Sequence, residues 1–415
     1  MVSGSPKSYD KQLRIPPCLV SARNDSPMSL SSLPLSYCTN VHPGLTAEEV
    51  VHGLTNYAAP IAASFAQPLA AGLWLAKPVI DELLTSETAR SNLCDALKQQ
   101  GLSCYTLNAF PYGNFHSDRV KEQVYLPDWT TDDRRNYTLA CVTLLSRLMP
   151  EDVEGSVSTV PLGFKSLATD PEFRQHCGGQ LIRTAIGLAE LKRKSRRTVR
   201  LAIEPEPCCV LETTAETLEF FEQLLLQCRS EVERQAVQEH LGVCYDICHQ
   251  SVEFEDVAES IQSLVTAGIR INKVHITNAI EVQNPGDNPA ALAALAQYVE
   301  PRYLHQTFAK SATGTTCQID LDQTLCESPS DEFRTADCWR VHFHVPVDRE
   351  SLGPLGTTRA DLVRALAAVA TLDYAPHLEV ETYTWEVLPS GEKPDLVTGF
   401  SRELIATHEL LNGLN

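Results

Sequence analysis

The segment from Gly242 to His249 joins an apolar run to two side chains that could bind a metal ion. The run is typical of a buried strand, and Asp246 and His249 stand three residues apart at its end. A carboxylate oxygen together with an imidazole nitrogen suits divalent cations such as Mn, Zn or Fe(II). The spacing also fits a second interpretation, in which Asp246 is the N-cap of a helix and His249 is a surface histidine.

Polar side chains occupy the ends of several other predicted strands. Side chains alternate along a strand, so residues two apart share a face. This pairs Glu204 with Glu206, Glu379 with Glu381, and Arg340 with the two histidines of the segment His342-Phe343-His344. Charged groups inside a barrel cost free energy unless they are paired or bind a metal. The predicted metal ligands are Glu204, Asp246, His249, His275, His344 and Glu381.

The same residues allow less specialised interpretations. Glu204 and Glu381 could form salt bridges with Arg340 or Lys273. His275 could be a hydrogen-bonded core histidine, and His342 could lie in the metal site or support it. Glu206 and Glu379 are expected to support the ligands. The candidate catalytic residues are Glu204, Glu381, His249 and Arg340.

The elements that must position these residues alternate between strand-like and helix-like segments. Eight such units predict a closed parallel (β/α)8 TIM barrel, with an open sheet as the alternative. Thr46, Thr131 and the pair Thr213 and Glu216 mark expected helix starts. The predicted barrel strands cover residues 35–42, 71–76, 102–110, 156–160, 198–206, 241–248, 271–277 and 377–385.

Two stretches stand outside this alternation. Residues 1–33 are rich in Ser and Pro and are expected to be a disordered leader, which leaves 34–415 as a single barrel domain. An insertion is expected between strands seven and eight, at about 284–346. It would contain a helical piece at 289–298, a β-hairpin at 302–325 with Gly314 at its turn, and an extra strand at 339–345.

Composition excludes several functional classes. The net charge is −19, from 53 acidic and 34 basic residues, which disfavours binding to nucleic acid. No apolar run approaches the ~20 residues that a membrane-spanning helix needs, and the N-terminus lacks the apolar core of a signal peptide. The 14 cysteines are scattered without paired CxxC spacing, which indicates reduced thiols and a cytoplasmic location.

The order Glu, Asp-x-x-His, His, Glu over predicted strands five to eight resembles the xylose isomerase-like TIM barrel superfamily, which includes sugar isomerases, epimerases and endonuclease IV. Ile203-Glu204-Pro205-Glu206-Pro207 is similar to the isomerase segment whose first Glu binds metal, but Glu206 stands where those isomerases have a catalytic Lys. Residues 242–249 are similar to the endonuclease IV segment in which both Asp and His bind zinc. His342-Phe343-His344 replaces an Asp-x-His of that family, and Gly72-Leu73-Trp74-Leu75 lacks a matching His.

A narrower resemblance covers most of the chain after residue 33. Four segments resemble the EboE family of metabolite traffic proteins: residues 35–44, 110–116, 302–306 and 381–385. That family belongs to a gene cluster implicated in moving small-molecule precursors across a bacterial inner membrane. The resemblance implies a small-molecule metabolite as ligand and membrane proteins as partners in a transport pathway.

Three functional hypotheses follow. The first is a divalent-metal-dependent isomerase or epimerase (Mn, Zn, Mg or Fe), in which the metal polarises a carbonyl while Glu204 and Glu381 exchange protons with the substrate. His249 and Arg340 would orient substrate oxygens, and the loop 110–129 would cover the site. The second is a metal-dependent hydrolase or phosphoesterase of endonuclease IV-like type, with a second ion on His249, His342 and His344. The third is a non-catalytic metabolite-binding carrier.

Overall fold

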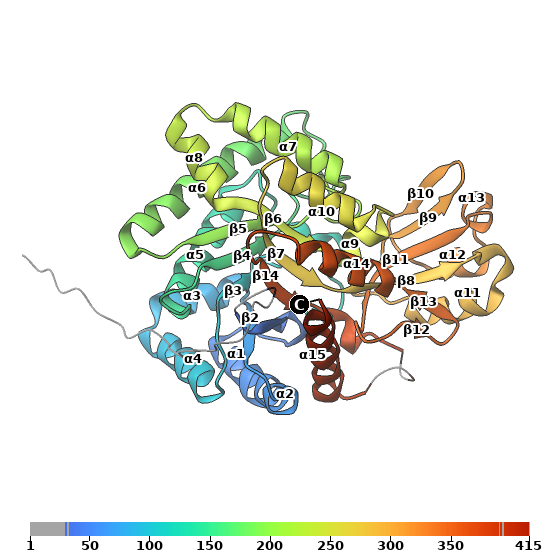
Figure 1. Cartoon of the computed structure of the whole chain (residues 1–415), viewed down its shortest axis with the longest axis horizontal. Coiled ribbons are helices and arrows are strands. Elements are labelled where there is room, and N and C mark those ends of the chain that lie inside the picture. The colour runs from blue at the N-terminus through green and yellow to red at the C-terminus, as the bar shows by residue number, and fades with distance from the viewer. Residues whose placement is uncertain (1–29, 31–32, 390, 392–393, 415) are drawn as a thin grey trace, which may run out of the picture.

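Eight parallel strands close a barrel in the computed structural model, which describes residues 30, 33–389, 391 and 394–414 (Figure 1). The predicted (β/α)8 TIM barrel is therefore confirmed, and the open sheet is excluded. The strands follow one another around the barrel in the order β1-β14-β7-β6-β5-β4-β3-β2. They are β1 (Leu35–Cys38), β2 (Leu69–Trp74), β3 (Thr106–Asn108), β4 (Gly155–Thr159), β5 (Val199–Ile203), β6 (Leu241–Asp246), β7 (Ile271–Ile276) and β14 (His377–Val380).

The barrel strands are buried, except for the half-buried Arg200 of β5, because the helices cover their outer face and side chains fill their interior. This explains the apolar runs of β2 and β6 in the sequence. The predicted leader, residues 1–33, lies outside the described residues except for Leu30 and Leu33. None of the helices in the described part of the chain is long and apolar enough to cross a bilayer.

Helices pack around the barrel, and the three predicted N-caps are present. The hydroxyls of Thr46 and Thr131 accept from the third backbone N–H of their helices, and Thr213 forms a reciprocal capping box with Glu216. The surrounding helices are α1 (Ala47–Gly53), α2 (Ala59–Phe65), α3 (Lys77–Thr85), α4 (Glu87–Gln99), α5 (Asp132–Leu148), α6 (Phe173–Ser195), α7 (Thr214–Gln227), α8 (Glu231–His240), α9 (Ile247–Val252), α10 (Val257–Thr266), α14 (Arg359–Val369) and α15 (Leu396–Gly413).

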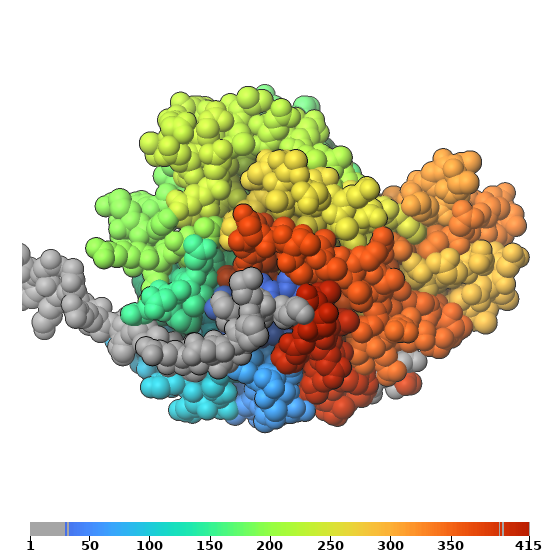
Figure 2. All heavy atoms as spheres, viewed as in Figure 1, coloured from blue at the N-terminus to red at the C-terminus, as the bar shows by residue number. Residues whose placement is uncertain are grey.

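A second, six-stranded sheet is inserted between β7 and β14 and forms a lobe at one side of the barrel (Figures 1 and 2). Its order is β10-β9-β11-β8-β13-β12. Short helices α11 (Pro289–Leu295), α12 (Gln323–Glu327) and α13 (Asp331–Arg334) connect its strands. The strands are β8 (Asn278–Gln283), β9 (Thr307–Ser311), β10 (Gly314–Gln318), β11 (Cys338–Val345), β12 (Ser351–Leu352) and β13 (Leu355–Thr357).

This inserted sheet is larger than the expected segment of about 284–346. It begins at Asn278, almost directly after β7 ends at Ile276, and it closes at Thr357. The predicted hairpin corresponds to β9 and β10, with Gly314 at its turn, and the predicted extra strand corresponds to β11. β8 and the β12–β13 hairpin were not predicted, and each is completed only by pairing within the sheet.

Candidate metal centre

Four predicted ligands meet at the carboxyl ends of neighbouring barrel strands. Glu204 directly follows β5, Asp246 ends β6, His275 lies in β7, and Glu381 directly follows β14. These strands are adjacent, and the register pairs Asp246 with His275 across β6 and β7. The ligand atoms of the four residues, here called the barrel cluster, all lie within 4.8 Å of one another. All four side chains are buried.

The His275 imidazole is the centre of the barrel cluster. Its Nδ1 lies 2.9 Å from Glu204 Oε1, 2.9 Å from Glu381 Oε2 and 3.5 Å from Asp246 Oδ2. Burial opposes a proton on this ring, but the surrounding negative groups raise the pKa of His275 well above its ordinary value. The ring thus lies at a position where three carboxylates favour a positive charge, as they would favour a cation.

Two oxygens of the barrel cluster remain without hydrogen-bond partners, namely Glu204 Oε2 and Asp246 Oδ2. Burial raises the pKa of Glu204 to about 7. Burial acts in the same direction on Asp246, but the neighbouring His249 and His344 outweigh it and lower its pKa. Unpaired buried carboxylate oxygens are costly, so their presence beside an imidazole fits a site built for a divalent cation.

The two carboxylate oxygens of Asp246 have different contacts. Its Oδ1 accepts from the His249 backbone N–H at 3.1 Å and from Thr277 Oγ1 at 2.8 Å, which makes Asp246 the N-cap of α9. The N-cap interpretation of the sequence is therefore correct for Asp246, but His249 is buried and lines the pocket. Because capping uses only Oδ1, Oδ2 stays available to the barrel cluster.

A buried ion pair supports the barrel cluster from inside the barrel. Glu379 Oε1 lies 3.3 Å from His275 Nε2 and 2.6 Å from Lys273 Nζ, and Ser36 donates to Glu379 Oε2 at 2.8 Å. Glu379 therefore takes the supporting role expected of it. A Cβ at Gly72 would lie 1.5 Å from Glu379 Oε2, so β2 must lack a side chain at this point. Lys273 pairs with Glu379 rather than with Glu204 or Glu381.

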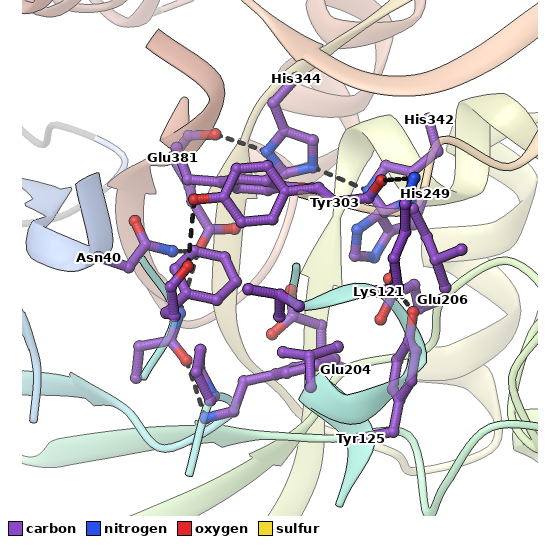
Figure 3. Close-up of a pocket in the computed structure, with 18 residues that line it drawn as sticks. Asn40, Lys121, Tyr125, Glu204, Glu206, His249, Tyr303, His342, His344 and Glu381 are labelled. Carbon is purple, nitrogen blue, oxygen red and sulfur yellow. Dashed lines mark hydrogen bonds and ion pairs between the residues drawn. The ribbon is translucent and has the colours of Figure 1, made fainter. Parts of the chain in front are cut away.

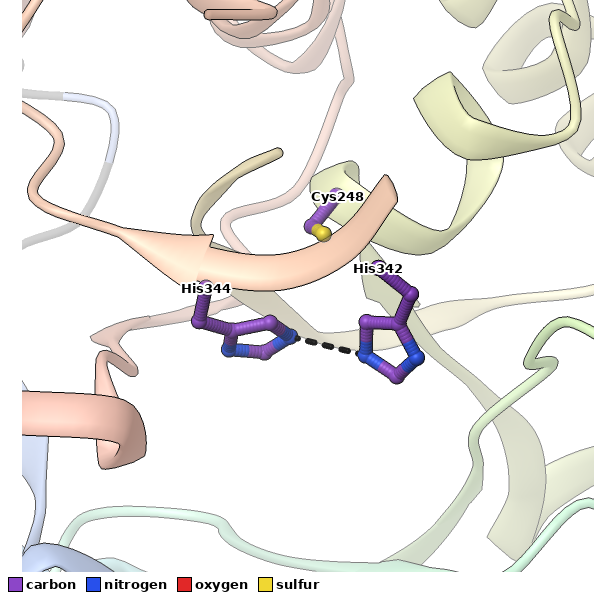
Figure 4. A group of neighbouring side chains, drawn as sticks. All are labelled: Cys248, His342 and His344. Atoms are coloured by element: carbon purple, nitrogen blue, oxygen red, sulfur yellow. Dashed lines mark hydrogen bonds between the residues drawn. The ribbon is translucent and has the colours of Figure 1, made fainter. Parts of the chain in front are cut away.

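His249, His342 and His344 form a second group, here called the histidine cluster. His249 comes from α9, while His342 and His344 come from β11 of the inserted sheet. His342 Nε2 and His344 Nε2 lie 3.3 Å apart (Figure 4). Asp246 Oδ2 is 3.9 Å from both His249 Nε2 and His344 Nε2, so this carboxylate lies between the two clusters.

The hydrogen bonds of the histidine cluster fix its tautomers. His249 Nδ1 lies 2.9 Å from the Pro205 carbonyl oxygen, and His344 Nδ1 lies 2.7 Å from that of Glu381. His342 Nδ1 lies 2.7 Å from Gln306 Oε1. Since these oxygens only accept, each Nδ1 carries a proton, and whenever one of the rings is neutral its Nε2 keeps a lone pair. Burial lowers the pKa of His249 to about 4 and also lowers that of His342.

The convergent lone pairs of His342 and His344 repel one another unless a proton or a cation lies between them. Acceptors that hold the far nitrogen of a histidine are the usual support of metal-binding imidazoles. Two further donor groups lie near these rings, because Glu206 joins His249 and His342 within 4.8 Å, and Cys248 forms a separate group with His342 and His344. The residue types and tautomers therefore fit a second divalent cation.

Arg340 does not join the site, contrary to the sequence-based expectation. Its Nε lies 2.9 Å from Glu281 Oε2, and its Nη1 lies 2.9 Å from Asp361 Oδ2 and donates to the Ser251 carbonyl at 2.7 Å. The guanidinium also lies over the Phe254 ring, 4.7 Å from its centroid. Arg340 therefore ties the inserted sheet to the end of α9 and to α14, and it is absent from the pocket lining that the structure describes.

Several site residues escaped the sequence-based analysis because only the fold brings them to the barrel cluster. Asn40 and Asn108 donate to Glu381 Oε1 at 2.8 and 2.9 Å. Tyr125 donates to Glu206 Oε1 at 2.7 Å, and Gln306 holds His342. A signal existed for two of them, since Asn40 and Gln306 lie in segments that carry the resemblance to the EboE family.

A pocket is lined by Glu204 and Glu381 of the barrel cluster and by the three residues of the histidine cluster, whereas Asp246 and His275 are absent from its described lining (Figure 3). Its floor and one side carry the carboxylates and imidazoles, and its remaining walls come from the loop after β3 and from the inserted sheet. The predicted cover by the loop 110–129 agrees with this lining. The pocket is lined by Asn40, Asn108, Phe110, Pro111, Phe115, Val120, Lys121, Val124, Tyr125, Glu204, Glu206, His249, Tyr303, Leu304, His342, His344, Glu381 and Tyr383.

Comparison with solved structures agrees with the fold. A xylose isomerase-like TIM barrel protein from Mycobacterium smegmatis, in complex with magnesium, matches 94% of this chain and 99% of its own, with 10% identity and a TM-score of 0.52. D-psicose 3-epimerase from Clostridium cellulolyticum H10, with D-tagatose, matches 92% and 99%, with 11% identity and a TM-score of 0.48.

A zinc-bound protein named IOLI matches 92% of this chain and 98% of its own, with 10% identity and a TM-score of 0.44. The chain thus shares the fold of xylose isomerase-like TIM barrels. No protein-family model and no curated protein matches the sequence. The narrower resemblance to the EboE family has no support from these comparisons.

Proposed function

We propose that this protein is a divalent-metal-dependent isomerase or epimerase that acts on a small α-hydroxycarbonyl metabolite. The observation that carries the proposal is the barrel cluster, in which three carboxylates surround one imidazole nitrogen at the carboxyl ends of the strands. In barrels of this kind the active site lies at that end. The fold shared with a magnesium-bound xylose isomerase-like barrel adds support.

Glu204, Asp246, His275 and Glu381 would hold the cation. Oxygen and nitrogen donors in this proportion suit Mn, Zn, Mg or Fe(II). When bound, such an ion supplies Lewis acidity toward a carbonyl oxygen of the substrate. The two carboxylates differ in their hydrogen bonds. Glu204 Oε2 has no partner, whereas Glu381 Oε1 accepts from two side-chain amides.

In the proposed reaction, Glu204 and Glu381 move a proton from and to the carbon next to the carbonyl. Glu204 has one oxygen free of hydrogen bonds within the pocket lining, so it can reach a substrate C–H without losing a structural contact. Glu381 is oriented by Asn40 and Asn108. His249 would direct its Nε2 toward a substrate oxygen or toward a second ion. Arg340 has no part in this scheme.

The proposed proton transfer can be tested by hydrogen exchange. The full chain, loaded with Mn²⁺, is incubated in D2O with a panel of ketoses and aldoses, and deuterium at the carbon next to the carbonyl is measured by mass spectrometry. We expect exchange with at least one compound, and its loss in Glu204→Gln. Glu403→Gln serves as the control, because Glu403 is a buried carboxylate that contacts Thr382 and Trp385 outside the pocket.

Absence of exchange across the panel, in protein that binds the metal, would refute the isomerase proposal. If such protein binds a sugar without exchange, the carrier role implied by the EboE resemblance becomes the better account. Its proposed membrane-protein partners would then be sought.

The histidine cluster favours a second candidate function. Two cations held on either side of Asp246 would suit a hydrolase or phosphoesterase, since paired ions can assist both the attacking and the leaving oxygen. Metal stoichiometry separates the candidates. One ion per chain in purified protein favours the isomerase, and two or more favour the hydrolase.

A further inference from the structure

Two cysteine thiols from separate parts of the fold contact each other where the barrel meets the inserted sheet. Cys208 lies in the turn after β5, and Cys317 lies in β10, the edge strand of the inserted sheet (Figure 1). The Cys208 thiol donates a hydrogen bond to Cys317 Sγ, and both cysteines are free of disulfide bonds. Neither belongs to the metal-binding groups or to the pocket lining formed by the described residues.

Backbone contacts on both sides hold the two thiols together. Gln306 Nε2 donates to the Pro207 carbonyl at 3.1 Å, which ties the residue before Cys208 to the segment that leads into β9. β9 pairs with β10, and the register places Phe308 opposite Cys317. The contact between the thiols therefore follows from the way the inserted sheet packs on the turn after β5.

The two thiols differ in exposure and in protonation. Cys317 is exposed, whereas Cys208 is only 8% exposed. The hydrogen bond from Cys208 lowers the pKa of Cys317 to about 7, and Lys165 acts in the same direction, against burial and the charge of Glu212. The same hydrogen bond is the main cause that raises the pKa of Cys208. Cys317 is thus an accessible thiol with much thiolate character near neutral pH, and a protonated thiol lies beside it.

The acidic groups around Cys317 are balanced. Lys165 Nζ forms an ion pair with Glu212, so the nearest carboxylate has its own cation. Burial and the neighbouring Glu212 raise the pKa of Glu253 to about 10, so this carboxyl group is uncharged at neutral pH. A thiolate on Cys317 therefore meets Lys165 and a neutral acid, not a field of uncompensated negative charge.

Two other uses of this thiol pair are disfavoured. A metal ion would need further ligands, and no group of metal-binding side chains among the described residues contains Cys208 or Cys317. Cys209, which directly follows Cys208, is fully buried, and its thiol is hydrogen-bonded to Tyr125. Cys317 is therefore the thiol that faces Cys208.

We propose that Cys208 and Cys317 are a site of reversible oxidation, at which a peroxide joins the turn after β5 to the inserted sheet by a disulfide bond. The Cys317 thiolate attacks one oxygen of hydrogen peroxide, the O–O bond breaks, and hydroxide leaves a sulfenic acid on Cys317. The Cys208 sulfur then attacks the Cys317 sulfur, the S–O bond breaks, and the Cys208 proton goes to the departing hydroxide. The two thiols lose two electrons in total, and one peroxide is reduced to two water molecules. A dithiol reductant reverses the reaction by thiol–disulfide exchange.

The disulfide would connect the two sides of the histidine cluster. The turn after β5 carries the Pro205 carbonyl that holds His249, and the inserted sheet carries His342 and His344. To form the bond, the sulfur atoms must approach to about 2.05 Å. β10 can shift toward the turn, because it pairs only with β9. The proposal concerns the thiols alone, so it stands or falls independently of the proposed enzymatic function.

Peptide mapping of oxidised protein tests the proposal. The reduced, desalted full chain is treated with a small excess of hydrogen peroxide, digested without reductant and analysed by mass spectrometry. We expect a peptide pair that joins Cys208 to Cys317 and disappears after treatment with dithiothreitol. Cys338→Ser is the control, because this half-buried cysteine of β11 lies in the same sheet, and the variant should form the disulfide like the parent. Folded protein in which Cys208 and Cys317 stay reduced, or in which either is linked to Cys209 or to a second copy, would overturn the proposal.

The unfolding temperature measures whether the disulfide fastens the inserted sheet. Oxidation should raise it in the parent, because the bond closes a long loop of the unfolded chain, and should leave it unchanged in Cys317→Ser. Since Cys317 is exposed, its serine variant is expected to fold like the parent. Equal unfolding temperatures in reduced and oxidised parent protein would contradict the connection between the two sides.

Two substitutions of Cys208 separate its hydrogen bond from its role in the disulfide. Cys208→Ala removes the donor, so alkylation of Cys317 by iodoacetamide at pH 7 should slow about tenfold. Cys208→Ser keeps an O–H donor and should preserve most of this reactivity, but it cannot form the disulfide, so dimedone should trap the sulfenic acid on Cys317. Equal alkylation rates in the parent and in folded Cys208→Ala, or absence of the trapped sulfenic acid in Cys208→Ser, would contradict the proposed route.

Discussion

Asp246 belongs to the barrel cluster and borders the histidine cluster, but the protein holds the two clusters differently. In the barrel cluster three carboxylates surround His275, and Glu379 behind this ring is paired with Lys273. In the histidine cluster each Nδ1 faces an oxygen outside the cluster, and the Nε2 atoms of His342 and His344 face one another. The carboxylates of the barrel cluster outnumber its imidazole, so a divalent cation would balance charge there, whereas in the histidine cluster a proton or cation would bridge facing nitrogens.

The two clusters also differ in origin. Barrel strands and their ends supply the whole barrel cluster, while the inserted sheet supplies two of the three imidazoles of the histidine cluster. The barrel cluster therefore depends on the barrel fold, whereas the histidine cluster also depends on the inserted sheet. Metal binding at the two clusters should therefore be separable by mutation, except at Asp246.

The largest expected effect is that of Asp246→Asn. Its Oδ2 lies between the clusters, and an amide nitrogen there would present protons to both sites. We expect metal content measured by mass spectrometry to fall to background at both sites. Glu403→Gln, a buried carboxylate outside the pocket, should keep the metal content of the parent. If Asp246→Asn kept the metal content of the parent, Asp246 would not be a ligand at either site.

Substitution within the histidine cluster should affect one site only. In a parent protein that carries two ions per chain, as the hydrolase candidate requires, we expect His342→Gln to lose one of them, because His342 lies outside the barrel cluster. His240→Gln is the matched control, since His240 is buried and its Nδ1 also meets a carbonyl, that of Val199. Loss of all metal from His342→Gln would show that the clusters act as one unit. If the number of metal ions per chain did not change in His342→Gln, the histidine cluster would not be a metal site.

A smaller effect is expected behind the barrel cluster. Glu379→Gln removes the negative charge that faces His275 Nε2, so metal affinity should fall by about 10- to 100-fold in competition with a chelating indicator. This variant also leaves Lys273 without its partner, which lowers stability. The double variant Lys273→Met, Glu379→Gln should recover the unfolding temperature but not the affinity. Recovery of both would make Glu379 a purely structural residue.

The smallest effect on the metal sites is expected for Arg340→Met. Arg340 bonds Glu281, Asp361 and Ser251 away from the pocket, and its side chain is 15% exposed. The free energy of unfolding should drop by about 2 kcal/mol in urea denaturation, while metal content stays at the parental value. A change in metal stoichiometry in folded Arg340→Met would restore the role in the site that its position in the sequence suggested.

Local patterns in the sequence predicted the barrel and the residues of its cluster. Buried strands read as apolar runs, helix caps mark the intervening helices, and a polar residue at a strand end must face the mouth of a closed barrel. These rules depend only on short stretches of sequence and on the geometry of a closed barrel. They predicted that Glu204, Asp246, His275 and Glu381 lie together, as the structure shows. They also assigned Glu379 a supporting role.

The other features of the site depend on contacts between segments that are far apart in the chain. β8 and β11 pair across about 60 residues, with a register shift between Val341 and Val345, and this pairing places His342 and His344 over Asp246 while Arg340 turns toward Glu281. Alternation along the strand predicted that Arg340, His342 and His344 share a face. It could not show which of these side chains would lie over the barrel and which would lie beside α9. The contacts of Asn40 and Asn108 likewise join segments far apart in the chain, and such pairings depend on the packing of the whole molecule.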